Sequence, residues 1–345
     1  MHTVRCTAEL ARLANPLMIG PVTLPNRVFL APMSGISDRP FRDLAAAFGA
    51  GMVVSEMIAG EQLAGGDPES LVRVERGRTG PHVVQLAGRE EQWMAEGARA
   101  ATDAGADVID INMGCPAKKV TSGYSGSALM RDLDHAVRLI EATVSATPRP
   151  VTLKMRLGWD GASVNAPELA RRAEDAGVRM VTVHGRTRCQ FYEGAADWAA
   201  IRSIKEAVSI PVIANGDLTS VDGLEPMLRL SGADGVMIGR AACGRPWLPG
   251  QFATFAATGT VPEAPAGDAR RAIVLAHYEA IIEQHGPALG VRTARKHLGR
   301  YMDHAASEAA DHSGLRRAIL TETDHRVVIR LLGTWFGNAD MRRAA

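Results

Sequence analysis

From about Arg27 to Arg240, short apolar or β-branched runs alternate with longer stretches in which apolar residues recur every three or four positions. This alternation is typical of repeated strand–helix units. Several helical stretches end in Gly-Ala or Gly-Val, where glycine can adopt the left-handed conformation that terminates a helix. The runs expected to form strands are Val28–Ala31, Met52–Ser55, His82–Leu86, Asp107–Ile111, Val151–Met155, Met180–Val183, Val212–Ala214 and Gly235–Ile238.

Eight strands alternating with helices are the number that closes an α/β barrel of roughly 250 residues. The predicted fold class is therefore α/β, a (β/α)8 TIM barrel. The competing architecture is an open doubly wound sheet, which would normally carry G-x-G-x-x-G after its first strand. No such sequence follows the first run here, so we favour the closed barrel.

A different pattern begins after Thr258–Asp268, a segment whose prolines and glycines interrupt helical periodicity. Beyond it, apolar residues recur at three- and four-residue spacing, which predicts a C-terminal all-α helical bundle. We place the barrel domain at residues 1–257 and the helical domain at residues 268–345. Helices are expected at Ala269–His285, Gly290–His304, Ser313–Leu320 and Thr323–Phe336.

Composition adds limits rather than a function. Of the 345 residues, 46% are hydrophobic and 22% charged, which is ordinary for a globular protein. The formal net charge is only +1, so a polyanionic partner would have to bind a local patch. The N-terminus lacks the apolar run of a signal peptide, and no segment is long enough to span a membrane. We expect a cytoplasmic monomer that does not bind membranes.

The cysteines are far apart in the chain and include no Cys-x-x-Cys pair, so neither a zinc site nor a disulfide framework is indicated. A reducing compartment fits this pattern best. They are Cys6, Cys115, Cys189 and Cys243. We interpret Cys6 and Cys243 as packing or surface residues and leave the role of Cys189 open.

Active sites of such barrels lie at the C-terminal ends of the strands. Polar residues and glycines occupy these positions: Pro32-Met33-Ser34-Gly35, Gln85, Asn112 to Lys119, Lys154 with Arg156, His184 to Arg188, Asn215-Gly216-Asp217 and Gly239-Arg240. Glycines after the seventh and eighth strands are where a phosphate is expected, because a bare backbone lets N–H groups approach its oxygens. The alternative is that these glycines only relieve tight turns.

Two residues in this set have chemistry of their own. Lys154 lies in an otherwise apolar strand and needs a partner for its charge, either a cofactor's electron-rich edge or an internal salt bridge. Cys115 lies in a Gly-Cys-Pro loop close to Lys118 and Lys119. Its thiol could donate a proton or, with a lowered pKa, act as a nucleophile, or it could be an inert loop residue.

Taken together, these motifs resemble the tRNA-dihydrouridine synthase family, and its bacterial B-type members in particular. The resemblance extends from about Met18 into the C-terminal helices and depends on the order and spacing of several motifs. Ser34 departs from the alanine that the family often has there. The motifs are Ala31-Pro32-Met33 with Ser37-Asp38-Arg39-Pro40-Phe41-Arg42, Asp110-Ile111-Asn112-Met113-Gly114-Cys115-Pro116 with Lys118-Lys119, His184-Gly185-Arg186-Thr187-Arg188, and Ile213-Ala214-Asn215-Gly216-Asp217.

The resemblance implies that NADPH reduces an FMN, which then passes hydride to a uracil ring in tRNA. Cys115 is implied as the acid that protonates the ring, and no metal is implied. The implied FMN contacts are Pro32, Met33, Ser34, Gln85, Lys154, His184, Asn215, Gly216, Asp217, Gly239 and Arg240. Candidates for contact with the substrate RNA in the barrel are Asn112, Lys118, Arg156 and Arg186.

A uridine in folded RNA must leave its stack to enter a barrel, so the rest of the RNA has to be held elsewhere. The helical domain carries basic residues at spacings that bring several onto one side, with His297 and Tyr301 adjacent. They are Arg292, Arg295, Lys296 and Arg300. Such residues are often only a solvated face, but the resemblance implies that this domain binds RNA.

Two other functions compete with this interpretation. An FMN barrel acting on a free metabolite, such as a dihydroorotate dehydrogenase or an enone reductase, would share the fold and the phosphate site. It would not explain the basic helical region or the residues around Cys115. A barrel that only binds RNA or regulates expression would not need both Cys115 and Lys154.

Overall fold

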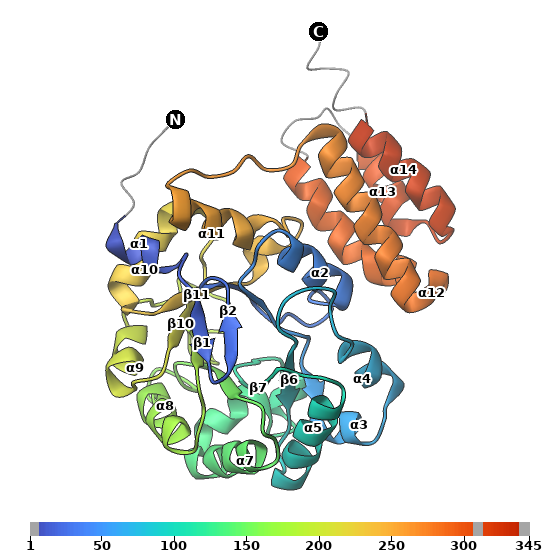
Figure 1. The fold of residues 1–345 in the computed structure, drawn as a ribbon. Coiled ribbons are helices and arrows are strands. Elements are labelled where there is room, and N and C mark those ends of the chain that lie inside the picture. The colour runs from blue at the N-terminus through green and yellow to red at the C-terminus, as the bar shows by residue number, and fades with distance from the viewer. Residues whose placement is uncertain (1–6, 306–312, 338–345) are drawn as a thin grey trace. The chain divides into compact units, whose positions relative to one another are not determined.

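The protein is described from a computed structural model, which covers residues 7–305 and 313–337. The described residues form two compact units (Figure 1). One contains the residues up to Ala241 together with Pro249–Val261, and the other contains Ala242–Leu248 together with the residues from Pro262 onward. The short segment 242–248 thus packs with the second unit although it lies before the proline-rich boundary in the sequence.

Within the described residues of the first unit, nine parallel strands form one sheet in the order β4-β3-β11-β10-β9-β8-β7-β6-β5. Val54, directly after β4, forms a parallel bridge with Val83 of β6, and this closes the ring. The strands are β3 (Val28–Leu30), β4 (Met52–Val53), β5 (Ile58–Ala59), β6 (Val83–Ala87), β7 (Val108–Met113), β8 (Val151–Arg156), β9 (Val181–His184), β10 (Val212–Asn215) and β11 (Gly235–Ile238). The predicted barrel is confirmed, and each predicted run contains an observed strand.

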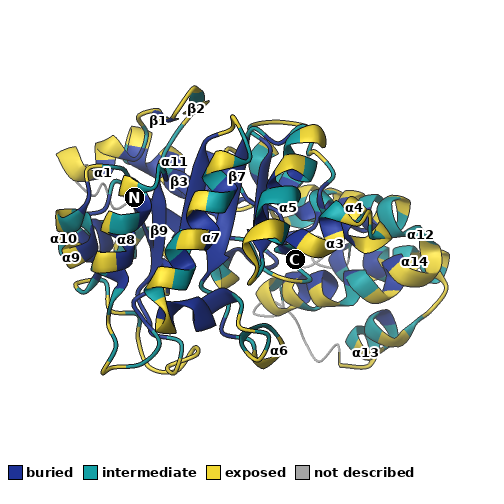
Figure 2. Cartoon of the chain, turned by 90° about the horizontal axis from the view of Figure 1, so that it is seen from below, coloured by how far each residue is buried: buried dark blue, intermediate teal, exposed yellow. Residues whose placement is uncertain are grey.

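Helices surround this barrel, and their outer faces are exposed while the strands are buried (Figure 2). Strands buried on both faces explain why the apolar runs are almost continuous. The longer helices are α2 (Arg39–Ala47), α5 (Glu91–Asp103), α7 (Leu133–Ser145), α8 (Ala166–Asp175), α9 (Ile201–Ala207), α10 (Leu224–Ser231) and α11 (Leu248–Thr258). Shorter ones are α3 (Gly60–Ala64), α4 (Pro68–Arg73), α6 (Lys118–Thr121) and the 3-10 turns η1 (Gly126–Arg131), η2 (Val221–Gly223) and η3 (Arg240–Ala242).

The amino-terminal end of the barrel is covered by elements that the sequence pattern did not predict. Helix α1 (Ala8–Arg12) precedes an antiparallel hairpin of β1 (Leu17–Ile19) and β2 (Val22–Leu24). Leu17, Ile19 and Leu24 join the buried cluster that contains residues from the starts of the barrel strands, such as Val83 and Val108. The barrel is therefore closed by apolar packing at this end, and its polar interior lies toward the other end.

The second unit is helical, with α12 (Gly267–Ala305), α13 (Ser313–Thr321) and α14 (His325–Gly337). Helix α12 is interrupted at Gly286, whose φ of 72° is left-handed, and Pro287 follows it. The two helices predicted on either side of residues 286–289 therefore correspond to the two arms of α12. In the described part of the chain, no helix is both long enough and apolar enough to cross a membrane.

Candidate active site

Side chains that alternate along the barrel strands point into the barrel, and toward the carboxyl ends they are polar. The register places Asp110 beside both Gln85 and Thr152. In the next row, Lys154 lies beside Asn112. The inward-facing side chains are thus apolar at the end of the barrel next to the hairpin. They are hydrogen-bonding groups at the other end, where barrel enzymes bind their ligands.

Asp110 is buried and lies at the centre of the row formed by Gln85, Asp110 and Thr152. Its carboxylate accepts hydrogen bonds from Gln85 Nε2 at 2.7 Å and from Thr152 Oγ1 at 2.6 Å. Burial raises the pKa of Asp110, although these two hydrogen bonds and the charge of Lys154 oppose the rise. Asn112 Nδ2 donates in turn to Gln85 Oε1 at 2.8 Å, so the orientation of the Gln85 amide is fixed on both sides.

Lys154 Nζ donates to Asn215 Oδ1 at 3.1 Å, and Asn215 Nδ2 donates to the carbonyl of Met237 at 2.8 Å. Burial, followed by the charge of Arg156, lowers the pKa of Lys154 to about 8, against the opposing effect of Asp110. Within residues 7–305 and 313–337, Lys154 forms no ion pair with a carboxylate. The internal salt bridge that the sequence allowed is therefore not found among these residues.

Cys115 is held at the mouth of the barrel by its own backbone. Its N–H donates to Asn112 Oδ1 at 3.0 Å, and its carbonyl accepts from Ser127 Oγ at 2.8 Å. A side chain at Gly126, where φ is +62°, would bring Cβ within 2.9 Å of that carbonyl. The half-buried thiol is therefore presented by a loop fixed at both ends.

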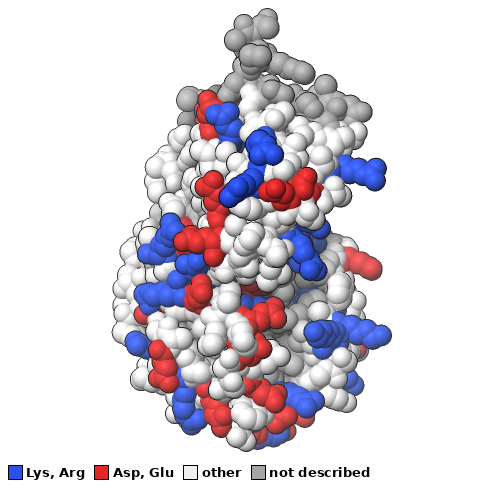
Figure 3. Space-filling model, turned by 90° about the vertical axis from the view of Figure 1, so that its right-hand side faces the viewer, with Lys and Arg blue, Asp and Glu red and all other residues white. Residues whose placement is uncertain are grey.

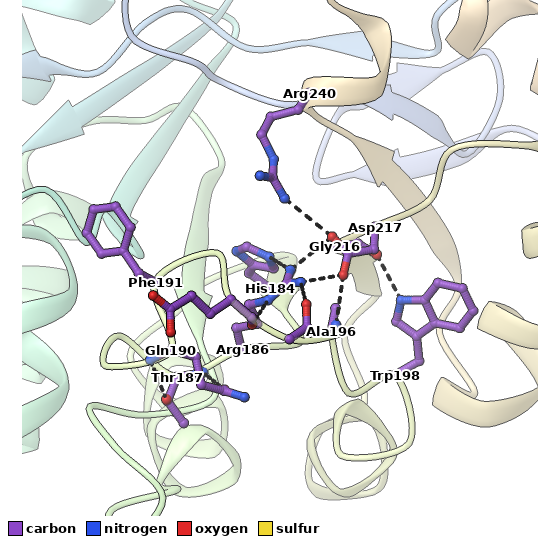
Figure 4. A network of polar contacts seen from close by, with 12 residues as sticks. His184, Arg186, Thr187, Gln190, Phe191, Ala196, Trp198, Gly216, Asp217 and Arg240 are labelled. Atoms are coloured by element: carbon purple, nitrogen blue, oxygen red, sulfur yellow. Dashed lines mark hydrogen bonds and ion pairs between the residues drawn. The ribbon is translucent and has the colours of Figure 1, made fainter.

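The loop after β9 forms a second polar network (Figure 4). Arg186 is buried, and its guanidinium contacts both carboxylate oxygens of Asp217, at 3.0 Å and 2.5 Å. It also donates to the carbonyls of Glu193 and Gly194. Burial alone would raise the pKa of Asp217. The hydrogen bond from Arg186 acts in the opposite direction, and the pKa of Asp217 lies below its usual value. All three nitrogens of the Arg186 guanidinium are engaged in these contacts. Arg186 therefore holds the loop in place, and its side chain is buried.

His184 lies beside this network and is neutral over the physiological range. Burial, then the positive charges of Lys154, Arg156 and Arg186, lower its pKa far below the usual value. Gly216 adopts a φ of +120°, and a side chain there would bring Cβ to 2.8 Å from the His184 ring. The glycine thus leaves the space that lets the imidazole and the strand end approach each other.

Arg156 and Tyr192 form the side of the opening next to Cys115. Arg156 is buried and donates to the carbonyls of Gly114, Thr187 and Phe191 at 2.8–2.9 Å. Its guanidinium lies 5.4 Å from the Tyr192 ring centroid, and that of Arg240 lies 4.5 Å from the same centroid. The partly exposed Tyr192 was not among the residues expected in the site, because a tyrosine in a loop carries no distinctive spacing signal.

The remaining predicted residues lie at the first and last barrel strands. Met33 N–H donates to Ser37 Oγ at 2.8 Å, and a side chain at Gly239 would come within 3.9 Å of Met33 Sδ. Pro32 is half-buried beside them and Ser34 is exposed. The barrel therefore brings the strand-end residues predicted from the sequence to one end, from β3 round to β11.

The family model of the dihydrouridine synthases matches residues 29–328. This chain belongs to the dihydrouridine synthase family. It is 54% identical over 308 residues to a probable tRNA-dihydrouridine synthase of Rhizobium leguminosarum, covering 89% of this chain and 94% of the relative. It is also 50% identical over 293 residues to a tRNA-dihydrouridine synthase B of Xanthomonas axonopodis, covering 84% and 88%. The resemblance to B-type members is thus confirmed.

Among solved structures, the histamine dehydrogenase of a Rhizobium species superposes with a TM-score of 0.57 at 16% identity. The match covers 79% of this chain and 51% of that one. At this identity the likeness concerns the fold alone, and it agrees with the closed barrel described above.

In this family member, the predicted basic residues of the helical unit differ in their surroundings. Arg292 and Lys296 are exposed, whereas Arg295 donates to the carbonyls of Thr321 and Glu322 at the end of α13. The neighbouring His297 and Tyr301 are buried. On the face drawn in Figure 3, basic and acidic side chains are interspersed, as the near-zero net charge would suggest.

The other cysteines differ from Cys115 in their surroundings. Cys189 is exposed on the loop after β9, and Cys243 is buried in the helical unit. Cys6 lies outside the described residues. Only Cys115 among the described cysteines is both accessible and part of the loop that Asn112 fixes at the barrel mouth.

Proposed function

We propose that this chain is an FMN-dependent tRNA-dihydrouridine synthase that uses NADPH as reductant. The observation that carries the proposal is the arrangement of two groups at the barrel mouth. Cys115, a partly exposed cysteine fixed in its loop, lies at the same end of the barrel as the partly buried ammonium of Lys154, which has no carboxylate partner among the described residues. The relatives named as tRNA-dihydrouridine synthases support the choice of RNA as substrate.

The residues at the carboxyl ends of the strands fit a flavin mononucleotide. Lys154 and Asn215 would face its polar ring edge, and Gln85 would offer an amide whose orientation Asp110 fixes. Gly216, Asp217, Gly239 and Arg240 would surround its phosphate, where open backbone and a guanidinium are suited to an anion. Pro32, Met33, Ser34 and His184 would complete the contacts. When bound, the flavin would accept hydride from NADPH and supply it to C6 of a uracil ring.

The proton for the neighbouring carbon has to come from this chain. Hydride addition at C6 leaves negative charge on C5 and the adjacent carbonyl, so a positioned acid accelerates the step. The thiol of Cys115 transfers its proton to C5, and the resulting thiolate is reprotonated from water. Asn112 and Ser127 keep the thiol in place through the backbone of Cys115, while Arg156 braces the same loop at Gly114.

RNA binding is assigned to both domains. Lys118 lies exposed directly after the Cys115 loop, and Arg292 and Lys296 are exposed on α12. Asn112, Arg156, Arg186 and Arg295 use their side chains to hold the backbone or neighbouring residues, so for these we propose positioning roles. The barrel domain at 1–257 carries the chemistry and the helical domain at 268–345 holds the tRNA. We further propose that the protein acts as a monomer in the cytoplasm.

The test is mass spectrometry of dihydrouridine in tRNA from cells that lack this gene, with and without a plasmid-borne copy. We expect loss of dihydrouridine at specific positions and its restoration by the plasmid. A plasmid encoding Cys115→Ala is the matched control and should not restore it. Normal dihydrouridine levels in the deletion strain, together with turnover of dihydroorotate by the purified protein, would contradict the proposal and favour a metabolite reductase.

A further inference from the structure

Three loops at the carboxyl ends of neighbouring strands place two arginines on one tryptophan. Arg131 ends η1 in the connection after β7, Trp159 follows β8, and Arg188 follows β9. The Arg131 guanidinium lies 5.0 Å from the Trp159 ring centroid and the Arg188 guanidinium lies 4.8 Å from it. The two charges therefore lie within about 10 Å of each other, each on the π-system of the same indole.

The charges of this cluster are not balanced by ion pairs. Neither Arg131 nor Arg188 forms a salt bridge with a carboxylate in the described part of the chain. The buried Nε of Arg188 also has no hydrogen-bond partner among the described residues. Asp160 lies near enough for Arg131 to contribute to lowering its pKa, but the hydrogen bond from the Ser163 side chain is the largest cause. Asp160 Oδ1 is thus already occupied by the turn at Ala162 and Ser163.

The cluster is built onto the same framework as the catalytic loop. Helix η1, which ends at Arg131, contains Ser127, whose N–H and hydroxyl both donate to the carbonyl of Cys115. The backbone of Arg188 donates to Gly158 at 3.0 Å, and that of Cys189 donates to Trp159 at 2.8 Å. The backbones that carry Trp159 and Arg188 are therefore tied to each other, and the backbone that carries Arg131 is tied to the Cys115 loop.

We infer that Arg131, Trp159 and Arg188 form a phosphodiester clamp for the RNA strand next to the uridine that enters the barrel. This inference rests on the proposed function and adds to it the residues that would contact the RNA phosphates. A guanidinium presents a planar fork of donors to phosphate oxygens, and stacking on an indole orients that fork before the ligand arrives. Two guanidinium groups that form no ion pair among the described residues, held by one ring, bind two phosphate groups, or one group together. Trp159 acts as a positioning residue.

The test compares the salt dependence of tRNA binding by the full-length holoprotein and its variants. Each phosphate contact that is lost reduces the slope of log affinity against log salt by about one. We expect Arg131→Gln with Arg188→Gln to reduce the slope by one to two and to weaken binding at least tenfold at low salt. Thermal unfolding of each variant, followed in parallel, establishes that the variant is folded.

The chain offers a matched control at the opposite end of the same strands. Arg149 and Arg179 are exposed residues just before β8 and β9, and neither forms a salt bridge within the described ranges. Arg149→Gln with Arg179→Gln removes the same net charge, and we expect it to leave the slope unchanged. An equal fall in slope for both double variants would mean that only overall charge matters, and the clamp would be rejected.

Substitution of Trp159 separates positioning from charge. Trp159→Leu keeps both arginines but removes the ring, so we expect weaker tRNA binding, and Trp159→Phe should restore part of it. No difference between the two variants would reject the role of the ring. The phosphates of NADPH are the other source of such an anion. A raised KM for NADPH with an unchanged tRNA slope in the Arg131/Arg188 variant would reject the RNA clamp in favour of the dinucleotide.

If the wild-type holoprotein itself binds no tRNA, the clamp and the proposed function both fail. If it binds tRNA and forms dihydrouridine, but the Arg131/Arg188 variant keeps the wild-type slope, only the clamp fails. The two failures are therefore distinguishable in one series of titrations.

Discussion

The ammonium of Lys154 on β8 reaches across to the amide oxygen of Asn215 on β10, at 3.1 Å, with strand β9 between them. Burial, followed by the charge of Arg156, lowers the pKa of Lys154 to about 8, and the neutral amide of Asn215 brings no negative charge to oppose that shift. Asp110, one row further into the barrel, opposes that shift only in part. The site is therefore suited to an anion that no residue in the described ranges supplies through an ion pair.

Replacing Lys154 by methionine should make the bound flavin harder to reduce. The substitution keeps much of the side-chain volume but removes the charge that would stabilise a reduced, anionic flavin. We expect the midpoint potential to fall by at least about 30 mV, which is a tenfold change for a two-electron couple. Spectroelectrochemical titration measures it, and Lys154→Arg is the control that keeps the charge. An unchanged potential in Lys154→Met would show that the ammonium does not act on the flavin.

The same lysine predicts a pH dependence of stability in the flavin-free protein. Its pKa is about 8 in the folded protein and near 10.5 in an unfolded chain. Between these values the unfolded state binds more protons, so the free energy of unfolding rises with pH across that interval. Urea unfolding of wild type and Lys154→Met from pH 7.5 to 10.5 should show a rise that is smaller in the variant. Parallel curves for the two proteins would contradict the lowered pKa.

Replacing Cys115 by alanine should remove the proposed proton donor and leave the flavin site intact. A positioned general acid contributes about 10²- to 10⁴-fold, and we expect a loss of that size in the single-turnover rate of uracil reduction. Stopped-flow oxidation of the reduced holoenzyme by tRNA measures it, and tRNA binding is followed separately. Cys189→Ala, in the loop after β9, is the control cysteine and should retain the wild-type rate. A Cys115→Ala variant with full activity would require another acid.

The barrel could be predicted because eight of its nine strands have a local signal; β5 (Ile58–Ala59), a strand of two residues, was not predicted. A parallel strand buried on both faces is an apolar run of a few residues, and the helix-ending glycines mark where the next run begins. The interruption of α12 was predictable for the same reason, since Gly286-Pro287 breaks helical periodicity locally. The hairpin at Leu17–Leu24 was missed because its short strands pack on residues distant in sequence.

The location of the polar site could be predicted from the sequence. The hydrogen-bond and ion-pair partners of its individual side chains could not. Spacing places Arg295 on one side of a helix with Arg292, yet only the fold shows that Arg295 binds the carbonyls at the end of α13. Similarly, Arg186 lies in a motif at a strand end, but its pairing with Asp217 depends on the neighbouring strand. Asp110 lies within one of the family motifs but is not among the predicted site residues, because a carboxylate in a strand gives no sign of the two donors beside it.

Gly216 provides a test of how closely the residues at the ends of β9 and β10 have to pack. Alanine at this position must adopt a φ of +120° and would place Cβ 2.7 Å from the Cβ of Ala196 and 2.8 Å from the His184 ring. We expect Gly216→Ala to lower the free energy of unfolding by about 1–3 kcal/mol and to weaken flavin binding, since the strain and the overlap add. Gly161→Ala, in the loop after β8 where a Cβ would meet nothing within 4 Å, should change neither quantity by a comparable amount. Denaturant unfolding and flavin titration of both variants make the comparison. If Gly216→Ala matched Gly161→Ala in both measurements, the close approach of His184 to this turn would not be required for flavin binding.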